Sequence, residues 1–234
     1  MANLTGTERA RYVQAMFNRI AHRYDTMNRL MTAGQDVRWR RAVIRRAALP
    51  ANSRLLDLGA GTGDLAQEAL RQHPDCLPTA ADFTLGMMYR GRERPGANRI
   101  DWNAADALHL PYLDQSFDAV VSGFLLRNVS DIRQTLAEQY RVLKPGGRLV
   151  ALDTTRPPQS RLLTPLIKIH LHTVIPTLGQ IISGERDAYR YLPDSTEAFL
   201  AAEQMVERML VAGFRNVGFQ RLMLDTIAIH WGEK

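Results

Sequence analysis

The chain is nearly free of cysteine and has no long apolar run. Cys76 is the only cysteine among 234 residues, so an internal disulfide framework is excluded, and a metal site would have to use histidines and carboxylates. The most apolar stretch, 162–182, is interrupted by proline, lysine, histidine and glutamine, and no run of about 18 apolar residues occurs. The N-terminus has no apolar core of signal-peptide length. We therefore expect a soluble, cytoplasmic protein.

Acidic residues are scarce in the first 50 positions. Ten arginines and three acids give this segment a net charge of +7, whereas the whole chain carries +6, so the remainder is slightly acidic. A basic N-terminal segment predicts attraction to an anionic membrane surface, a nucleic acid or an acidic substrate. A solvated helical face is the alternative.

Strand-like and helix-like runs alternate after residue 50. The strand-like runs are 54–59, 77–82, 99–106, 117–124 and 148–154, and helix-like runs lie at 63–72 and 131–143. This alternation predicts an α/β fold, a Rossmann-like doubly wound and mostly parallel sheet with helices on both faces. The preceding segment is helical in pattern from Arg9, and one helix is expected at 38–48.

The pattern changes after residue 155. Residues 156–185 are rich in proline, aliphatic and basic residues, which predicts an insertion. We divide the chain into an N-terminal helical cap (1–50), a Rossmann-like core (51–155), an insertion or lid (156–193) and a closing segment (194–234).

The closing segment is expected to hold one helix and two strands. The ranges are 194–214 for the helix and 216–223 and 226–232 for the strands. Asp194 or Ser195 would cap the helix and Gly213 would end it. The two strands predict an antiparallel pair at the edge of the sheet.

Three glycines follow the first strand-like run. Gly59, Gly61 and Gly63 are spaced G-x-G-x-G, whereas a dinucleotide fingerprint needs G-x-G-x-x-G and would place its third glycine at Asp64. A carboxylate there neutralises the helix N-terminus on which a pyrophosphate would lie. Glycine still lets the backbone approach a ligand closely. The loop therefore predicts a nucleoside ligand without phosphates.

Acidic residues at three strand ends support a nucleoside site. Asp82 ends the second strand, 19 residues after Gly63, where a carboxylate can accept hydrogen bonds from a ribose diol. Asp106 ends the third strand and is placed to contact an adenine amino group. Asp57 precedes the glycine loop, where it could orient the loop amides or meet an ammonium group. A tight strand–helix turn with ordinary surface acids is the alternative.

Several motifs resemble class I S-adenosylmethionine-dependent methyltransferases. They are D-L-G-A-G-T-G-D (57–64), A-D (81–82), D-A-L (106–108), F-D-A-V-V-S (117–122) and R-V-L-K-P-G-G-R-L (141–149). Four further stretches resemble the ubiquinone/menaquinone biosynthesis C-methyltransferase family, at 17–41, 126–131 (L-R-N-V-S-D), 187–199 and 213–232. The resemblance implies S-adenosylmethionine as cofactor and a demethylated polyprenyl quinol, methylated at a ring carbon, as substrate. The cofactor residues expected are Asp57, Gly59, Gly61, Thr62, Gly63, Asp82, Ala105, Asp106 and Gly123.

Three features depart from the family pattern. Leu125 stands where the family usually has glycine, and residues 153–157 read D-T-T-R-P in place of E-F-S-K-P. The segment between Asp82 and Asp106 is short. These departures leave methyl transfer intact but leave the ring type open, and a paralog acting on another hydrophobic ring is an alternative.

The L-R-N-V-S-D motif supplies candidate residues for activating the methyl acceptor, the quinol. A quinol ring carbon is nucleophilic when its neighbouring hydroxyl is ionised, so the site must favour a phenolate. Arg127 stays protonated and would stabilise the phenolate or polarise a bound water, and Asn128 would bond the same oxygen. Asp131 is a candidate proton acceptor or a helix cap.

Four residues are expected to contact the substrate. Tyr24 and Asn28 would close over the cofactor or the ring, and Tyr189 and Tyr191 would line the acceptor site; packing roles are the alternative. The aliphatic insertion suits a polyprenyl tail arriving from a membrane, which predicts peripheral membrane association. A homodimer surface is the other interpretation of the insertion.

Three other classes compete with this hypothesis. An NAD(P)-dependent oxidoreductase is opposed by Asp64 at the third glycine position. A methyltransferase of RNA or protein is permitted by the basic N-terminal segment, but no interleaving of aromatic and basic residues supports a nucleic-acid partner. A non-catalytic member of a quinone-synthesis assembly is opposed by the presence of both cofactor acids and the L-R-N-V motif.

Overall fold

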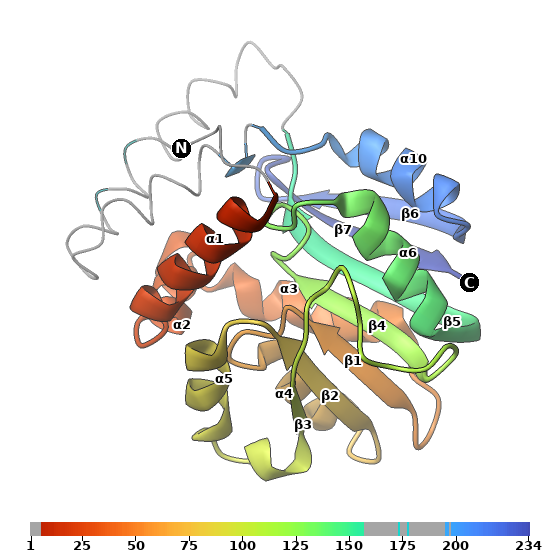
Figure 1. Cartoon of the computed structure of the whole chain (residues 1–234), viewed down its shortest axis with the longest axis horizontal. Helices are drawn as coiled ribbons and strands as arrows, with labels where there is room; N and C mark the ends of the chain where they lie inside the picture. The colour runs from red at the N-terminus through yellow and green to blue at the C-terminus, as the bar shows by residue number, and fades with distance from the viewer. Residues whose placement is uncertain (1–5, 157–172, 174–176, 178–194, 197) are drawn as a thin grey trace.

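The chain folds around a single seven-stranded sheet. The computed structural model describes residues 6–156, 173, 177, 195–196 and 198–234. The strand order is β3-β2-β1-β4-β5-β7-β6 (Figure 1). Strands β1 to β5 pair in parallel, and β7 runs antiparallel between β5 and β6. This order confirms the predicted mostly parallel sheet with an antiparallel C-terminal pair.

The strands lie close to their expected positions. They are β1 (Arg54–Leu58), β2 (Leu77–Asp82), β3 (Asp101–Ala104), β4 (Phe117–Gly123), β5 (Leu143–Thr154), β6 (Arg215–Leu222) and β7 (Ile227–Glu233). Strand β5 starts earlier than expected because Leu143 already pairs with Phe117. The next partner of β4 is Arg148, opposite Ala119, so the K-P-G-G residues bulge out of the ladder. Strand β3 is shorter than expected because the 3-10 helix η1 (Ala97–Arg99) precedes it.

Three helices form the segment before β1, here called the N-terminal cap. They are α1 (Gly6–Ile20), α2 (Tyr24–Met31) and α3 (Gln35–Ala47). Gly34 has a φ of 74° and separates α2 from α3, so the continuous helical pattern is broken there. Helix α3 begins three residues before the expected start at Arg38, and Ala48 ends it in a left-handed conformation.

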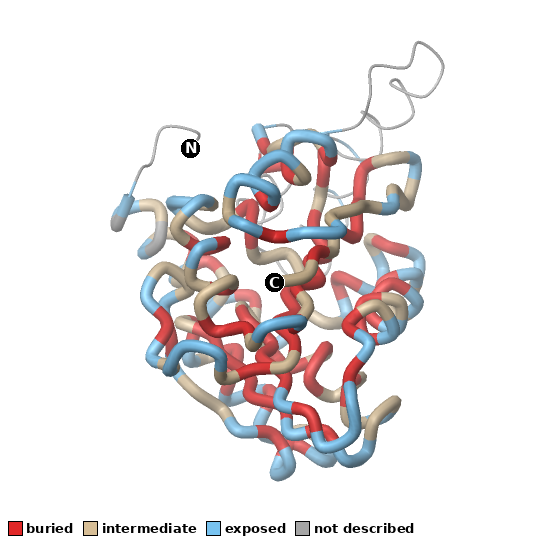
Figure 2. The backbone as a smooth tube through the Cα atoms, turned by 90° about the vertical axis from the view of Figure 1, so that its right-hand side faces the viewer, coloured by how far each residue is buried: buried red, intermediate tan, exposed pale blue. Residues whose placement is uncertain are grey.

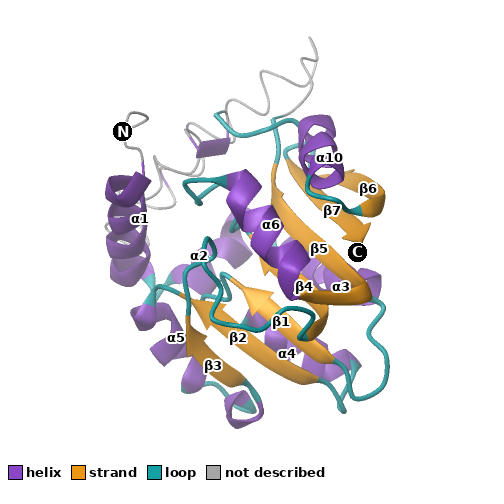
Figure 3. Cartoon of the chain, turned by 45° about the vertical axis from the view of Figure 1, so that its right-hand side comes forward, coloured by secondary structure: helices purple, strands orange, loops and turns teal. Residues whose placement is uncertain are grey.

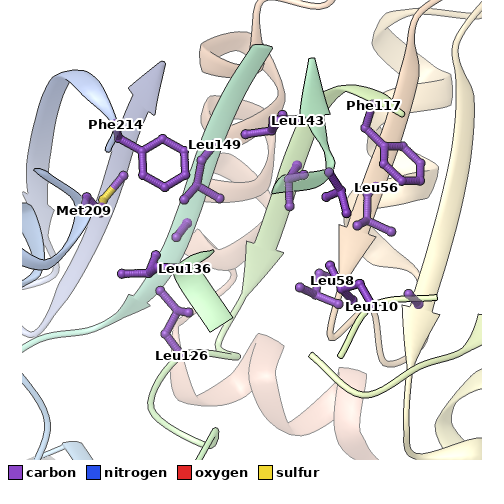
Figure 4. Close-up of a cluster of buried hydrophobic side chains, with 14 of the residues drawn as sticks. Leu56, Leu58, Leu110, Phe117, Leu126, Leu136, Leu143, Leu149, Met209 and Phe214 are labelled. Carbon is purple, nitrogen blue, oxygen red and sulfur yellow. The ribbon is translucent and has the colours of Figure 1, made fainter. Parts of the chain in front are cut away.

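Helices cover both faces of the sheet (Figure 3). The core helices are α4 (Asp64–Gln72), α5 (Leu85–Arg92), α6 (Ile132–Val142) and α10 (Ala202–Val211). Successive strand residues point to opposite faces, so Leu56 and Leu58 pack with α6 and α10 whereas Leu55 packs with α3 and α4. Figure 4 shows the first of these clusters, with Leu136 of α6 beside the strand leucines. Buried residues run through the centre of the molecule (Figure 2).

The prediction of a helix over 194–214 is wrong in its first half. Helix α10 starts at Ala202, where the side chain of Gln204 accepts from the Ala201 amide at 3.0 Å. Ser195 and Thr196 are helical, but a turn follows in which the Phe199 amide donates to the Thr196 carbonyl at 3.2 Å, and the Leu200 carbonyl accepts from the Arg156 amide at 3.2 Å. Phe199 is buried in the core, so the chain leaves the helix there and re-enters it only at Ala202. Ser195 therefore does not cap α10. Gly213, with a φ of 102°, follows the helix end as expected.

Candidate active site

The glycine loop joins β1 to α4 at the carboxyl edge of the sheet. Gly59, Gly61 and Gly63 all have positive φ, between 56° and 80°, which side chains with a Cβ rarely adopt. A Cβ on Gly59 would lie 2.8 Å from Leu125 Cδ1, so the loop and the segment after β4 approach each other closely. The backbone of the loop therefore lies directly against the segment after β4, at the carboxyl edge of the sheet.

A cleft in two parts opens beside this loop. Its smaller part encloses about 50 Å³ and its larger part about 250 Å³. Both parts are lined by Gly59, Asp82, Phe83, Leu125 and Asn128. We call this the cofactor cleft. Among the described residues that line it, two are carboxylates and none is an arginine, lysine or histidine.

The two carboxylates of the cleft are Asp82 and Asp106. Asp82 is buried, and its oxygens accept from the Gly61 amide at 2.8 Å and the Thr84 amide at 2.7 Å. Burial raises the pKa of Asp82, while these hydrogen bonds oppose the rise. Asp106 is exposed and accepts from the Leu108 amide at 2.9 Å. Each oxygen keeps a lone pair for a ligand hydroxyl or amine.

Three of the expected cofactor residues lie behind the loop rather than in the cleft. Asp57 is buried, accepts from the Ala66 amide at 3.0 Å, and has an oxygen without a partner. Burial, with the charges of nearby acids, raises the pKa of Asp57 to about 7. Thr62 donates to Asp25 at 2.8 Å, and Gly63 packs on Trp102. The remaining six line the cleft, namely Gly59, Gly61, Asp82, Ala105, Asp106 and Gly123.

The sequence argument from Asp64 against phosphate is wrong. Its carboxylate points behind the loop, where one oxygen accepts from Arg94 at 2.7 Å and the other pairs with Arg40 at 2.8 Å. Two guanidinium groups neutralise it, so it repels nothing in the cleft. The absence of a cation from the described lining of the cleft is the observation that opposes a pyrophosphate.

Arg127 follows β4 and is buried against an acid of β5. Its Nη1 donates to Asp153 Oδ1 at 3.0 Å, and its amide donates to the other oxygen at 3.2 Å. Arg127 is 5% exposed, and its Nε has no acceptor among the described residues. Burial raises the pKa of Asp153, and the Arg127 guanidinium opposes that rise. The pair leaves a hydrogen-bond donor unused, and the Arg127 guanidinium carbon lies 4.9 Å from the centre of the Phe124 ring, which lines the cofactor cleft.

The other predicted acceptor residues are only partly brought together. Asn128 lines the cleft and donates to the Phe124 carbonyl at 2.9 Å. Asp131 accepts from the Gln134 amide at 3.0 Å and so caps α6, in keeping with the capping alternative. Tyr24 lines the smaller part of the cleft, and burial raises its pKa. Asn28 is buried next to it.

Tyr189 and Tyr191 lie outside the described residues, as does most of the insertion. Their substrate contacts, the lid and the dimer surface therefore stay predictions.

Sequence reasoning missed several residues of this site. Asp153 was noticed only as a departure from the family pattern, although an acid at a strand end beside an arginine motif was a usable signal. Phe83 and the cap residues Val13 and Phe17 also line the cleft. Apolar residues at helical spacing predict burial but not what they cover, so these had no signal.

The carboxylates and apolar side chains that line the cleft fit S-adenosylmethionine. Carboxylates without a cation suit a ligand that carries hydroxyls and positive charge but no phosphate. Phe83, Met87 and Leu108 supply apolar walls for a flat base. Asp57, behind the loop, adds a buried carboxyl oxygen that has no partner among the described residues.

Comparison with known proteins agrees with this fit. The sequence model of the ubiE/COQ5 methyltransferase family matches residues 4–234. A protein of Desulfotalea psychrophila named ubiquinone/menaquinone biosynthesis C-methyltransferase UbiE is 46% identical over 95% of this chain and 90% of its own length. A demethylmenaquinone methyltransferase of Roseiflexus castenholzii is 39% identical over 97% of this chain and 95% of its own length.

A solved structure supports the fold alone. The [4+2]-cyclase SpnF has a TM-score of 0.70 at 19% identity, covering 98% of this chain and 96% of its own. Because that protein is named as a cyclase, the fold by itself does not fix the reaction. Fold, cleft and relatives together define a class I S-adenosylmethionine-dependent methyltransferase. The chain belongs to the ubiE/COQ5 methyltransferase family.

Proposed function

We propose that the chain transfers a methyl group from S-adenosylmethionine to a ring carbon of a demethylated polyprenyl quinol in quinone biosynthesis. The names of its relatives, which mention ubiquinone, menaquinone and demethylmenaquinone, support this substrate class. The observation that carries the proposal is the buried Arg127, whose Nε–H has no acceptor among the described residues and whose guanidinium lies against Phe124, a residue of the cofactor cleft.

The cofactor is held by the carboxyl ends of β1 to β4. Asp82 would accept from the ribose hydroxyls, and Ala105 and Asp106 would hold the adenine. The backbone at Gly59 and Gly61 would hold the amino-acid part, and Thr62, Gly63 and Asp57 support the loop from behind. When bound, the cofactor supplies a methyl group that its sulfonium already activates, so no nucleophilic side chain is required.

Arg127 acts on the acceptor oxygen. Its Nε–H donates to the hydroxyl next to the reacting carbon and favours the phenolate, and the proton leaves to water. Asn128 donates to the same oxygen. A buried guanidinium is effective here because the low local dielectric strengthens its attraction for an oxyanion. The aromatic rings of Phe17 and Phe83 keep water from the reacting carbon.

Methyl-label transfer tests the function directly. Labelled S-adenosylmethionine is incubated with the full chain and a demethylated benzoquinol or naphthoquinol, and tRNA serves as the control acceptor. We expect label in an extractable quinol and none in tRNA. The two quinols are compared because the relatives' names cover both ring types. Label in tRNA alone, or in neither quinol, would contradict the proposal.

The acceptor is membrane-soluble, so we also propose that the enzyme acts at the cytoplasmic face of a membrane. No helix of the described residues is both long and apolar enough to cross a bilayer. Helix α3 exposes Arg38, Arg41 and Arg45 in one stripe. Sedimentation with anionic vesicles should pellet the chain at low salt and release it at high salt. Failure to pellet at either salt would remove the membrane part alone.

A further inference from the structure

Behind the glycine loop lies a second cavity that the methyltransferase reaction does not use. It encloses about 430 Å³, more than either part of the cofactor cleft. Its lining comes from α2, α3, α4 and the turn at 94–99. It shares no residue with the cofactor cleft.

Arginine dominates this cavity, with two carboxylates beside five guanidinium groups. The arginines are Arg29, Arg40, Arg71, Arg94 and Arg99, and the acids are Asp64 and Glu68. Like charges crowded in one cavity repel unless an anion lies among them. The residues of the wall therefore leave positive charge in excess.

Several donors of the cavity lack a strong acceptor. Arg29 reaches the nearest carboxylate, Asp36, only at 3.6 Å, and Arg99 donates to the Pro74 carbonyl rather than to a carboxylate. Gln67 lines the cavity, and its Nε2 is buried without an acceptor among the described residues. Guanidinium forks and an amide N–H together match the oxygens of a phosphate group.

The inner wall of the cavity is also the rear support of the glycine loop. Arg94 donates to the Thr62 carbonyl at 3.0 Å as well as to Asp64, and Arg40 pairs with the other oxygen of Asp64. Arg40 is itself buried and also pairs with the buried Asp36 through Nη1, so an anion in the cavity would meet the Nη2 that now pairs with Asp64. An anion in the cavity would compete with Asp64 for both guanidinium groups.

We propose that this cavity binds a phosphate group and that its occupation weakens the binding of S-adenosylmethionine. The phosphate belongs to a soluble anion or to a lipid headgroup, which share the same chemistry. The coupling rests on the cofactor role of the glycine loop, whereas the binding of phosphate does not. By linkage, the cofactor must weaken phosphate binding by the same factor.

Calorimetry on the full chain tests the site without cofactor or quinol. Inorganic pyrophosphate and phosphate are titrated at constant ionic strength into the wild type and into Arg29→Ala/Arg99→Ala. These two arginines contact neither the glycine loop nor the cofactor cleft. The double variant Arg133→Ala/Arg215→Ala removes the same charge from exposed positions outside both the cavity and the α3 stripe. We expect saturable binding that the first variant weakens at least tenfold and the second leaves unchanged.

Vesicles of phosphatidylcholine with or without phosphatidylglycerol form the second arm. Pelleting that depends on phosphatidylglycerol, and that only Arg29→Ala/Arg99→Ala loses, would assign the phosphate to a headgroup; calorimetric binding would assign it to a soluble anion. Binding in neither arm, or equal loss in both variants, would overturn the site. The coupling is tested by measuring the Kd for S-adenosylmethionine with and without saturating ligand. An unchanged Kd would overturn the coupling, and quinol methylation stays testable in every case.

Discussion

Two loops meet at the carboxyl edge of the sheet, and they carry opposite chemistry. The loop after β1 presents glycine backbone, with Asp57 below it and Asp82 beside it, and no described cation faces the cleft there. The loop after β4 brings in a buried cation, Arg127, balanced by Asp153. Gly59 and Leu125 touch where the loops meet, so the two sets of groups belong to neighbouring loops, although Arg127 itself does not line the cleft.

The difference supports our proposal that one edge of the sheet serves both partners of a methyl transfer. A positively charged donor is favoured beside uncompensated carboxylates, and an oxyanion is favoured beside a guanidinium. Removing the charge from one loop should affect only the partner that this loop serves. Variants on the two loops therefore test whether each loop acts on one partner alone.

The largest effect is expected from the loop after β4. Arg127→Ala should lower kcat by about 10²- to 10³-fold because it removes a preorganised donor to the oxyanion. The Kd for S-adenosylmethionine should stay nearly unchanged, since Arg127 does not line the cofactor cleft. Steady-state kinetics and calorimetry measure the two quantities.

Folding must be controlled in this experiment. Arg127→Ala leaves the buried Asp153 unpaired, which costs about 3–5 kcal/mol of stability. Arg127→Ala/Asp153→Ala removes both charges and should restore stability but not turnover. Arg133→Ala, an exposed arginine of α6, is the matched control. Full activity in either Arg127 variant would discard the catalytic role.

The sequence predicted the first loop better than the second. The glycine spacing and the acids at strand ends are local signals, and they placed six of nine cofactor residues in the cleft. The direction of Asp64 was missed because its partners, Arg40 and Arg94, lie about 25 to 30 residues away in the chain and meet it only after folding. The Arg127–Asp153 pair is long-range in the same way.

The same limit applies to the closing helix. Residues 198–201 have helical propensity, but burial of Phe199 and the hydrogen bonds to Arg156 outweigh it. Strand β4, by contrast, was placed correctly. Most of its consecutive residues are apolar and buried, so the signal is local in the sequence.

The second-largest effect is expected on the pH dependence of the free energy of unfolding. Asp57 has a folded pKa of about 7, above the ordinary 3.8, so the folded chain binds its proton more tightly than the unfolded chain. This contribution is fully present below about pH 4 and is lost as pH rises to 7. Asp57→Asn should remove a penalty on the order of 4 kcal/mol at neutral pH. Urea unfolding from pH 4.5 to 7.5 measures it.

The comparison between variant and wild type is needed because His230 titrates in the opposite sense. Burial lowers the pKa of His230 to about 4, so its contribution is lost as pH falls below 6.5. That contribution cancels in the difference between the two chains. A difference that does not grow between pH 4.5 and 7 would show that Asp57 is ionised throughout.

The third-largest effect is expected on the affinity for S-adenosylmethionine. Asp82→Ala should weaken the binding of S-adenosylmethionine by about 1–3 kcal/mol, the cost of losing charged hydrogen bonds. Turnover at saturating cofactor should change much less, in contrast to Arg127→Ala. Asp75→Ala removes an exposed carboxylate that accepts from the Asn52 amide and should leave the Kd unchanged. Equal Kd values for both variants would remove Asp82 from the site.

The smallest effect comes from the backbone of the glycine loop. Gly61 has a φ of 56°, and a Cβ there would lie 3.2 Å from Met87 Cε, the mobile end of a side chain. Gly61→Ala should therefore cost about 1 kcal/mol in cofactor affinity, mainly from the left-handed conformation. Gly146→Ala places the same strain at a φ of 77° in open space and should lower stability without changing the Kd. If both variants bind S-adenosylmethionine as the wild type does, the loop backbone does not adjoin the cofactor, and the contrast between the two loops rests on the acids alone.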